Sequence, residues 1–443
     1  MDTPLYLALK EYQKRDPARF HMPGHKGVLP APLDGAAPWD ITEVEGAGSL
    51  YASSGPIAET EAAFARIYGA GASLLSAGGS TLCIQTMLAL FLPPGGTVLA
   101  ARGVHTAAVN AMALLDLHPR WLYPEIDPAT GLALPVTPRQ VSRALSETPA
   151  DAVYLTSPDY FGSMADIAGI AAACRRRGVP LLVDNAHGAH LHLLSPSPHP
   201  MGAGADACCD SLHKTLPCLT GAALLHLRDK ARRDRAKTMM SLFGSTSPSY
   251  LILLSADRCL GYLQGGAHRD LDAVSQQVAK LAALAEKRGF ALPAPPTDPL
   301  RLALGFSPLG YTADAFGAAL RRAGVEPEYL SGAFCVLLGG SAIPAAHWER
   351  LRSFVENLPP LPARQRVHPP FPPVRPRRRI SLRRALFAPA ETLPVEHCAG
   401  RTAAAAVAPC PPGIPLVLPG EELDQRAVLT LKSVGIHTAS VLK

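Results

Sequence analysis

Between residues 71 and 227, short apolar runs typical of strands alternate with segments that have the apolar spacing of helices. Strands that alternate with helices are typical of a mainly parallel sheet with helices on both faces, because each parallel connection has to cross over the sheet. We expect strands in six runs: ASLLSAG (72–78), GTVLAAR (96–102), DAVYLTSP (151–158), VPLLVDNA (179–186), ADACCDS (205–211) and AALLHLR (222–228). The pattern therefore predicts an α/β fold.

One helix in this region has recognisable ends. Residues 80–91 (STLCIQTMLALF) begin with Ser80 and Thr81, two residue types that cap helix N-termini, and Pro93-Pro94-Gly95 follows the last apolar residue. We therefore expect a helix here with Ser80 and Thr81 in the cap position.

The pattern changes after residue 250. Long helical stretches follow, and proline-rich passages at 292–298 and 359–379 indicate connectors rather than core. The length of 443 residues suggests two or three domains within one globular body. We expect an N-terminal arm and large domain over residues 1–270 and a smaller C-terminal domain over residues 271–443.

Charge gives little support for a nucleic-acid partner. The net charge of +6 is modest for this length, and 48% hydrophobic residues can form a large core. Positive charge is concentrated in Arg375, Arg377, Arg378, Arg379, Arg383 and Arg384. We interpret this run as the solvated face of a linker, with a polyanion site as the alternative.

Cysteine usage and the N-terminus favour the cytoplasm. The nine cysteines are scattered, and no Cys-x-x-Cys occurs, as expected for reduced thiols. The first 20 residues are amphipathic and charged, unlike a secretory signal. Glycine, proline or charge interrupts the apolar stretches well before the roughly 20 residues needed to span a bilayer. We expect a soluble cytoplasmic protein that binds no membrane.

Asp184 and Lys214 are the most informative pair, because each follows a short apolar run. Together they suggest pyridoxal 5′-phosphate (PLP): the lysine amine forms a Schiff base with the aldehyde, and the carboxylate keeps the pyridine nitrogen protonated. Their spacing of 30 residues is about one strand, a crossover and a second strand, which brings both to the carboxyl edge of one sheet. The alternative is two ordinary loop charges.

A phosphate group needs amides and hydroxyls at a helix N-terminus. Gly78-Gly79-Ser80-Thr81, between an expected strand and helix, supplies both kinds of donor. Ser80 and Thr81 are therefore the expected phosphate ligands. Taken alone, the same tetrapeptide fits a plain N-cap after a flexible turn.

Four motifs in order along the chain carry a family resemblance: RFHMPGHKG (19–27), DNAHGAHL around Asp184, SLHKTLP around Lys214, and CPPGIPLVLPGE (410–421). They resemble the bacterial ornithine/lysine/arginine decarboxylase family. The resemblance implies PLP-dependent fold type I, like aspartate aminotransferase, with a mainly parallel seven-stranded sheet and a smaller α+β C-terminal domain. It also implies decarboxylation of a basic amino acid to an amine for polyamine biosynthesis.

The resemblance assigns further residues to the cofactor. Ser211 and His213 are similar to positions that reach the phosphate, and His105 aligns with a histidine that stacks on the pyridine ring. Without the resemblance, His105 is a structural hydrogen bonder. His187 is expected near Asp184 and the ring. Asn185 stands where the family often has Glu, a change that affects the hydrogen bonding of Asp184.

His187, His190 and His192 could be mistaken for a metal site. Alternation along an extended segment puts His190 and His192 on one face, but no carboxylate or cysteine at ligand spacing completes a set. We therefore expect no metal.

Dimer formation is expected from residues 245–250 (STSPSY). This segment resembles a family loop that reaches the phosphate of the neighbouring subunit through Ser245 or Thr246. The alternative is a turn that caps the next helix. The chain resembles the short form of the family, without the N-terminal receiver-like domain that builds higher assemblies, so a homodimer with a shared active site is expected.

Recognition of a basic substrate needs a carboxylate for the distal cation. Glu43 and Asp40, in WDITEVEG, are expected for this role, because relatives have a similar acidic motif near the N-terminal arm. The alternative is a surface loop with ordinary charges. Relatives often have an acidic pair at the position of Ala47-Gly48-Ser49, so the choice between ornithine, lysine and arginine stays open.

Other functions remain alternatives. An aminotransferase, or a lyase acting on another amino acid, shares the cofactor geometry, and Arg401 could clamp a substrate carboxylate in an aminotransferase. A regulatory protein without catalysis is a further alternative, against which Lys214 and Asp184 together argue.

Overall fold

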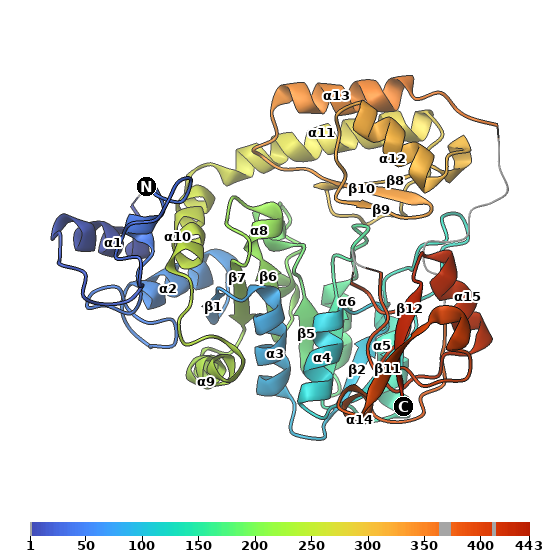
Figure 1. The fold of residues 1–443 in the computed structure, drawn as a ribbon, viewed down its shortest axis with the longest axis horizontal. Coiled ribbons are helices and arrows are strands. Elements are labelled where there is room, and N and C mark those ends of the chain that lie inside the picture. The colour runs from blue at the N-terminus through green and yellow to red at the C-terminus, as the bar shows by residue number, and fades with distance from the viewer. Residues whose placement is uncertain (1, 363–373, 410–412) are drawn as a thin grey trace. The chain divides into compact units, whose positions relative to one another are not determined.

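The computed structural model describes residues 2–362, 374–409 and 413–443 (Figure 1). By their internal contacts these residues divide into two units. The first contains residues 2–91 and 167–270, and the second contains residues 92–166 and the described residues from 271 to 443. The expected domains 1–270 and 271–443 remain a prediction.

The first unit carries four strands and the arm. Its strands are β1 (Ala72–Ser76), β5 (Leu181–Asp184), β6 (Ala207–Ser211) and β7 (Ala223–Leu227). Its helices are α1 (Pro4–Lys14), η1 (Ala37–Trp39), α2 (Pro56–Tyr68), α3 (Gly79–Phe91), α6 (Ile167–Arg175), η2 (Ala189–Leu193), α7 (Pro200–Ala203), α8 (Leu212–Thr215), η3 (Lys230–Arg232), α9 (Arg233–Phe243) and α10 (Tyr250–Gly265).

The second unit carries the other strands. They are β2 (Thr97–Ala101), β3 (His118–Leu122), β4 (Ala152–Thr156), β8 (Arg301–Gly305), β9 (Tyr329–Leu330), β10 (Phe334–Leu338), β11 (Ala390–Pro394) and β12 (Thr438–Leu442). The helices are α4 (Thr106–Leu114), α5 (Pro138–Glu147), η4 (Ser307–Leu309), α12 (Ala313–Arg322), α13 (Ala345–Asn357), α14 (Leu382–Leu386), η5 (Val395–His397) and α15 (Gln425–Ser433). Helix α11 (Ala267–Lys287) begins at the end of the first unit.

The expected α/β fold is confirmed. Seven strands form one sheet in the order β1-β7-β6-β5-β4-β2-β3, and all six predicted strands are present. The pairs β5–β6, β2–β4 and β2–β3 are parallel. Every residue of β1, β5, β6 and β7 is buried, as expected when both faces of a sheet are covered.

Two details differ from the prediction. Strand β3 was missed because it lies at the sheet edge and reads HPRWL, with a proline and an arginine in place of an apolar run. Strand β7 is antiparallel to both neighbours, because the connection from β6 is too short for a parallel crossover.

The start of α3 also differs. The helix begins at Gly79, whose φ of 65° suits glycine, so Ser80 and Thr81 lie inside the first turn and not in the cap position. The Gly79 amide donates to the Gly221 carbonyl at 2.9 Å. This bond fastens the start of the helix to the loop before β7.

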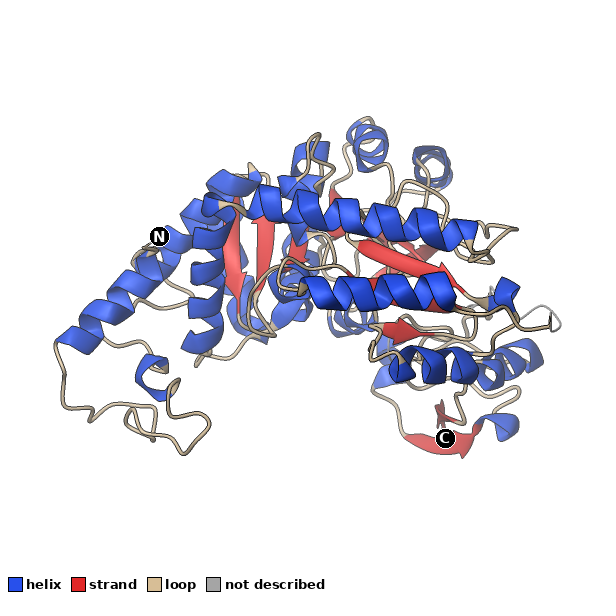
Figure 2. Ribbon diagram, turned by 90° about the horizontal axis from the view of Figure 1, so that it is seen from above, coloured by secondary structure: helices blue, strands red, loops and turns tan. Residues whose placement is uncertain are grey.

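The arm is anchored by a buried carboxylate. Asp257 of α10 accepts hydrogen bonds from the amides of Leu5 and Tyr6 at 3.2 and 2.9 Å and from the Thr3 hydroxyl. These bonds satisfy the amides at the start of α1, which its own N-cap residue does not reach. Figure 2 shows α1 near the N-terminus and the long loop that follows it.

Two smaller sheets complete the second unit. Strands β8, β10 and β9 form an antiparallel sheet with α11, α12 and α13 on one face (Figure 1). Strands β11 and β12 pair beside α15 around a separate core. Of the arginine run, Arg383 and Arg384 lie in helix α14 and not in a linker, and Arg379 pairs with Glu422 at 2.8 Å. Among the described residues, no helix is long and apolar enough to cross a membrane.

Candidate functional site

Asp184 is the last residue of β5 and is 2% exposed. One of its carboxylate oxygens, Oδ1, accepts from the Ala186 amide at 3.1 Å and from the Cys209 thiol at 3.6 Å. Asp184 and Cys209 are register partners in the parallel β5–β6 pair. The two strands therefore fix the direction of this buried carboxylate.

Lys214 lies in α8, the short helix that directly follows β6 (Figure 1). Its Nζ is 2.9 Å from Nε2 of His187, which follows β5 by three residues. A lysine ammonium can only donate, so His187 accepts through Nε2 and carries its ring proton on Nδ1. The expected meeting of the two strand ends at one edge of the sheet is present. The place of His187 near a cofactor ring stays a prediction.

Two buried hydroxyls meet at the start of α3. Ser80 Oγ is 2.7 Å from Ser211 Oγ at the end of β6, and the two residues are 8% and 2% exposed. Thr81, in contrast, is exposed. The structure thus brings Ser80 together with Ser211, while Thr81 turns outward.

A histidine and a threonine flank Lys214 in α8. His213 Nδ1 is 3.0 Å from the Ala222 carbonyl, so this ring holds the loop between β6 and β7. Thr215 Oγ1 is buried and has no hydrogen-bond partner among the described residues. An orphaned buried hydroxyl one residue after the lysine suits an absent polar group such as a phosphate.

His105 lies in the second unit and is exposed. Its Nδ1 accepts from the Ala107 amide at 3.1 Å and caps α4, which is the structural role named as the alternative. A Cβ placed on Gly413 would lie 2.8 Å from His105 Nε2, and Gly413 has φ +71°. The Thr106 hydroxyl and amide both donate to the Gly413 carbonyl, at 2.6 and 2.9 Å. Stacking of His105 on a cofactor stays a prediction.

The C-terminal motif is held by Arg102, which sequence reasoning missed. The guanidinium donates to the Pro415 and Leu416 carbonyls at 2.9 and 3.0 Å and pairs with Glu421 at 3.0 Å. Burial raises the pKa of Glu421, and Arg102 opposes that shift. The only sequence signal was an arginine directly after the apolar run of β2. Cys410, Pro411 and Pro412 of the motif lie outside the described residues.

A cavity of about 140 Å³ lies beside this motif. Its lining includes Arg102, Tyr123, Asp159, Tyr160, Phe161 and Leu416. Burial raises the pKa of Asp159 to about 6, against hydrogen bonds from backbone amides and the charge of Arg301. The Tyr160 hydroxyl donates to Glu328 at 2.8 Å. This aromatic cavity with a buried carboxyl was not found from the sequence.

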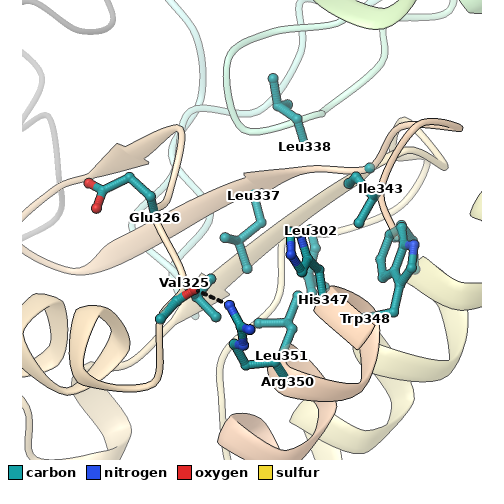
Figure 3. A pocket seen from close by; sticks show the side chains of 13 residues that line it. Leu302, Val325, Glu326, Leu337, Leu338, Ile343, His347, Trp348, Arg350 and Leu351 are labelled. Atoms are coloured by element: carbon teal, nitrogen blue, oxygen red, sulfur yellow. Dashed lines mark hydrogen bonds between the residues drawn. The ribbon is translucent and has the colours of Figure 1, made fainter. Parts of the chain in front are cut away.

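Figure 3 shows another cavity of the second unit, of about 190 Å³. Apolar side chains from α11, β8 and β10 form its lining together with His347, Trp348 and Leu351. Arg350 donates to the Gly324 carbonyl at its edge, at 3.1 Å. None of the residues expected at the cofactor lines it.

The expected substrate carboxylates lie in the arm. Asp40 Oδ2 is 3.2 Å from His25 Nε2 of the RFHMPGHKG motif. Glu43 is exposed and accepts from the Thr42 hydroxyl at 3.1 Å. Burial and the charge of Glu43 raise the pKa of Tyr51. Their role toward a substrate stays a prediction.

The loop before α10 is exposed at Ser245 and Thr246. Ser245 Oγ accepts from the Ser247 amide at 3.1 Å, and Ser249 caps α10 through the Ile252 amide at 3.4 Å. The capping alternative is therefore present in the structure. A reach toward a second subunit stays a prediction.

Two further residues have structural partners. Arg401 pairs with Glu391 of β11 at 2.7 Å and donates to the Leu442 carbonyl. The arginine suggested for an aminotransferase is thus engaged within the β11–β12 region.

The His192 ring lies 4.9 Å from the Tyr68 ring, and burial lowers the pKa of His192 to about 4.

Known proteins resemble this chain over most of its length. A family model described as Orn/Lys/Arg decarboxylase, major domain, matches residues 3–287, and one described as Orn/Lys/Arg decarboxylase, C-terminal domain, matches residues 373–434. Uncharacterized protein YaaO of Bacillus subtilis (strain 168) is 31% identical, over 97% of this chain and 94% of that protein. An arginine decarboxylase of the same organism is 29% identical, over 96% of this chain and 92% of that protein.

Solved structures share the fold. The constitutive lysine decarboxylase of E. coli has a TM-score of 0.82 at 19% identity, covering all of this chain and 82% of that one. A structure described as SPT with PLP has a TM-score of 0.59 at 13% identity, covering 80% of this chain and 83% of that one. The architecture is that of PLP enzymes of fold type I. With a family model across residues 3–287 and a 31% identical relative along nearly its whole length, the chain belongs to the Orn/Lys/Arg decarboxylase family.

Proposed function

We propose that this protein is a PLP-dependent decarboxylase of a basic amino acid and that arginine is its preferred substrate. Decarboxylation of a basic amino acid is the reaction that family membership supports. The observation that carries the proposal is the Lys214 amine, held 2.9 Å from His187 beside the strand that ends in Asp184. Arginine is chosen because a relative named arginine decarboxylase aligns over 96% of the chain.

The described residues fit PLP at both of its ends. Lys214 offers an amine, and Asp184 offers a buried carboxylate for the pyridine nitrogen. Ser80 and Ser211 offer hydroxyls at the start of α3, where helix amides also favour an anion, and Thr215 offers a buried hydroxyl in α8. When bound, PLP supplies an aldehyde that reacts with amines and a ring that withdraws electrons from the substrate α-carbon.

Each of these side chains has a task that follows from its surroundings. Asp184 is buried, and its negative charge would stabilise the protonated form of the pyridine nitrogen, because an opposite charge nearby stabilises a charged group. His187 lies within hydrogen-bond distance of Lys214 Nζ and would pass a proton to or from that amine with PLP bound. Lys214 would be the proton donor to the substrate α-carbon.

A substrate panel tests the reaction. Purified protein with PLP is incubated with arginine, lysine or ornithine, and carbon dioxide, amine and keto acid are measured. We expect equal amounts of carbon dioxide and amine, with arginine turned over fastest. Keto acid without carbon dioxide would mean an aminotransferase, and no turnover of any of the three would reject the assigned substrate class.

A homodimer with a shared active site is the second part of the proposal. The arm exposes large apolar side chains: Phe20 (96%), Met22 (65%), Val28 (76%) and Leu33 (56%). Large apolar groups gathered on one segment are typical of a protein interface. Light scattering should give twice the monomer mass, and Ser245→Ala should weaken PLP binding if the loop serves the neighbouring subunit.

We also place the protein in the cytoplasm and its amine product in polyamine synthesis. The eight described cysteines are free, as expected for a reducing compartment. Fractionation of cells, with amine content measured after deletion of the gene, tests both assignments.

A further inference from the structure

Asp210, on β6, is a fully buried carboxylate with three hydrogen-bond donors. Asn185 Nδ2 donates to Oδ1 at 2.6 Å, and Nε2 of His199 and of His226 lie 2.9 and 3.2 Å from Oδ2. We call these four residues the Asp210 network. Burial by itself raises the pKa of Asp210, but the two histidines hold it below its ordinary value.

Both histidines direct an N–H at the carboxylate. His199 Nδ1 accepts from the Met201 amide at 3.4 Å, so its ring proton lies on Nε2. His226 Nδ1 is 2.8 Å from Ser73 Oγ, and burial lowers the pKa of His226. The neutral ring then accepts from Ser73 and donates from Nε2. The network is thus a buried carboxylate that accepts N–H donors from Asn185, His199 and His226.

A metal ion is the competing interpretation. Ligand atoms of His199, Cys208 and Asp210 lie within 4.8 Å of one another. A metal needs unprotonated Nε2 atoms and a thiolate, whereas the network uses Nε2 of His199 for a proton. Burial also raises the pKa of Cys208 well above its ordinary value. The hydrogen-bond interpretation agrees better with a proton on His199 Nε2 and with a protonated Cys208 thiol.

The network adjoins the proposed cofactor residues on β5 and β6. Asn185 follows Asp184, and Asp210 lies four residues before Lys214. Side chains alternate along a strand, so Asp210 points away from the face where Cys209 meets Asp184. The Asn185–Asp210 bond therefore joins the ends of β5 and β6 on the face opposite the Asp184 carboxylate. A Cβ on Gly188 would lie 2.1 Å from Asn185 Oδ1, so this arrangement requires glycine there.

We propose that Asp210 is a positioning residue, which through Asn185 fixes the relative placement of the strand ends that carry Asp184 and Lys214. The inference rests on the proposed function, because those two residues are its cofactor ligands. It also gives a role to Asn185, which stands where the family often has Glu. The Asn185 amide donates to the Asp210 carboxylate on the neighbouring strand.

Asp210→Asn is the first test. It keeps the size of the side chain, but it places an NH2 group against the Asn185 Nδ2 donor and replaces the charged oxygen that both histidines contact with a neutral amide oxygen. We expect the Kd of the apo-protein for PLP to rise by about tenfold or more, the change expected when a hydrogen bond to a charged group is lost. The visible circular dichroism of bound PLP should change as well.

A swap variant and a control separate positioning from stability. In N185D/D210N the amide and the carboxylate exchange places, which restores a complementary pair and should return the PLP Kd close to the wild-type value. Asp257→Asn removes a carboxylate that is equally buried but binds Thr60 and the arm. It should lower the melting temperature without changing PLP affinity or the dichroism.

The outcomes are distinct. A D210N protein with wild-type PLP affinity and dichroism, and only a lower melting temperature, overturns the inference. Wild-type protein that contains stoichiometric metal, when D210N contains none, also overturns it. If D210N does not fold, Ser73→Ala weakens the network more gently, and wild-type PLP affinity and dichroism in S73A also overturn it. Wild-type protein that binds no PLP rejects the proposed function itself.

Discussion

Ser80 Oγ lies 2.7 Å from Ser211 Oγ, although 131 residues separate the two serines. The first turn of α3 and the end of β6 thus meet through a buried pair of hydroxyls. In the proposed function, these hydroxyls and the helix amides would contact the phosphate of PLP.

Removal of one hydroxyl should weaken PLP binding. Ser211→Ala is expected to cost about 1 to 3 kcal/mol of PLP affinity, the range for leaving a buried partner unsatisfied. Titration of apo-protein with PLP measures it. Thr81→Ala is the matched control, because Thr81 is exposed in the same turn. Equal affinities for the two variants would contradict the assigned phosphate site.

His187→Gln should slow turnover more than it weakens PLP binding. The ring contacts Lys214 at 2.9 Å, and loss of a proton-transfer partner commonly costs about 10²–10⁴-fold in rate. Steady-state kcat with arginine and the PLP Kd are measured together. His192→Gln, which removes a ring packed on Tyr68, is the control and should leave kcat nearly unchanged. A wild-type kcat for H187Q would remove His187 from the proton path.

Gly413→Ala should disturb His105. The added Cβ would lie 2.8 Å from the ring, at a backbone φ of +71°. Gly400 has φ +79° and open space around it, so Gly400→Ala carries only the backbone cost of about 1 to 2 kcal/mol. We expect G413A, but not G400A, to change kcat and the visible spectrum of bound PLP. Identical effects of both variants would mean that His105 has no part in the reaction.

Asp159 should make the stability of the protein depend on pH. Its pKa of about 6 lies above the ordinary value, so the folded protein binds the proton more tightly than the unfolded chain. This contribution is therefore complete at low pH and is lost as the pH rises through about 6. In urea unfolding, the wild type should lose stability relative to Asp159→Asn between pH 4 and 7. A constant difference over that range would show that the pKa is not raised.

The apolar pattern was sufficient to predict the six buried strands, because β5, β6 and their neighbours are covered on both faces and read as continuous apolar runs. Edge strand β3 has no such pattern. Asp184 and Lys214 could be proposed as cofactor residues because each ends an apolar run. Arg102 and Asp210 could not, since their partners Glu421 and His226 are known only from the folded chain.

The visible spectrum of Lys214→Ala tests the covalent role of Lys214 most directly. Purified wild-type protein with PLP should absorb in the visible region and lose this band on treatment with borohydride. Reduction should leave the cofactor covalently attached to the peptide that contains Lys214. The variant should lack the band and release no carbon dioxide from arginine. A variant that keeps both the band and the turnover would contradict the assignment of Lys214 as the residue that binds PLP.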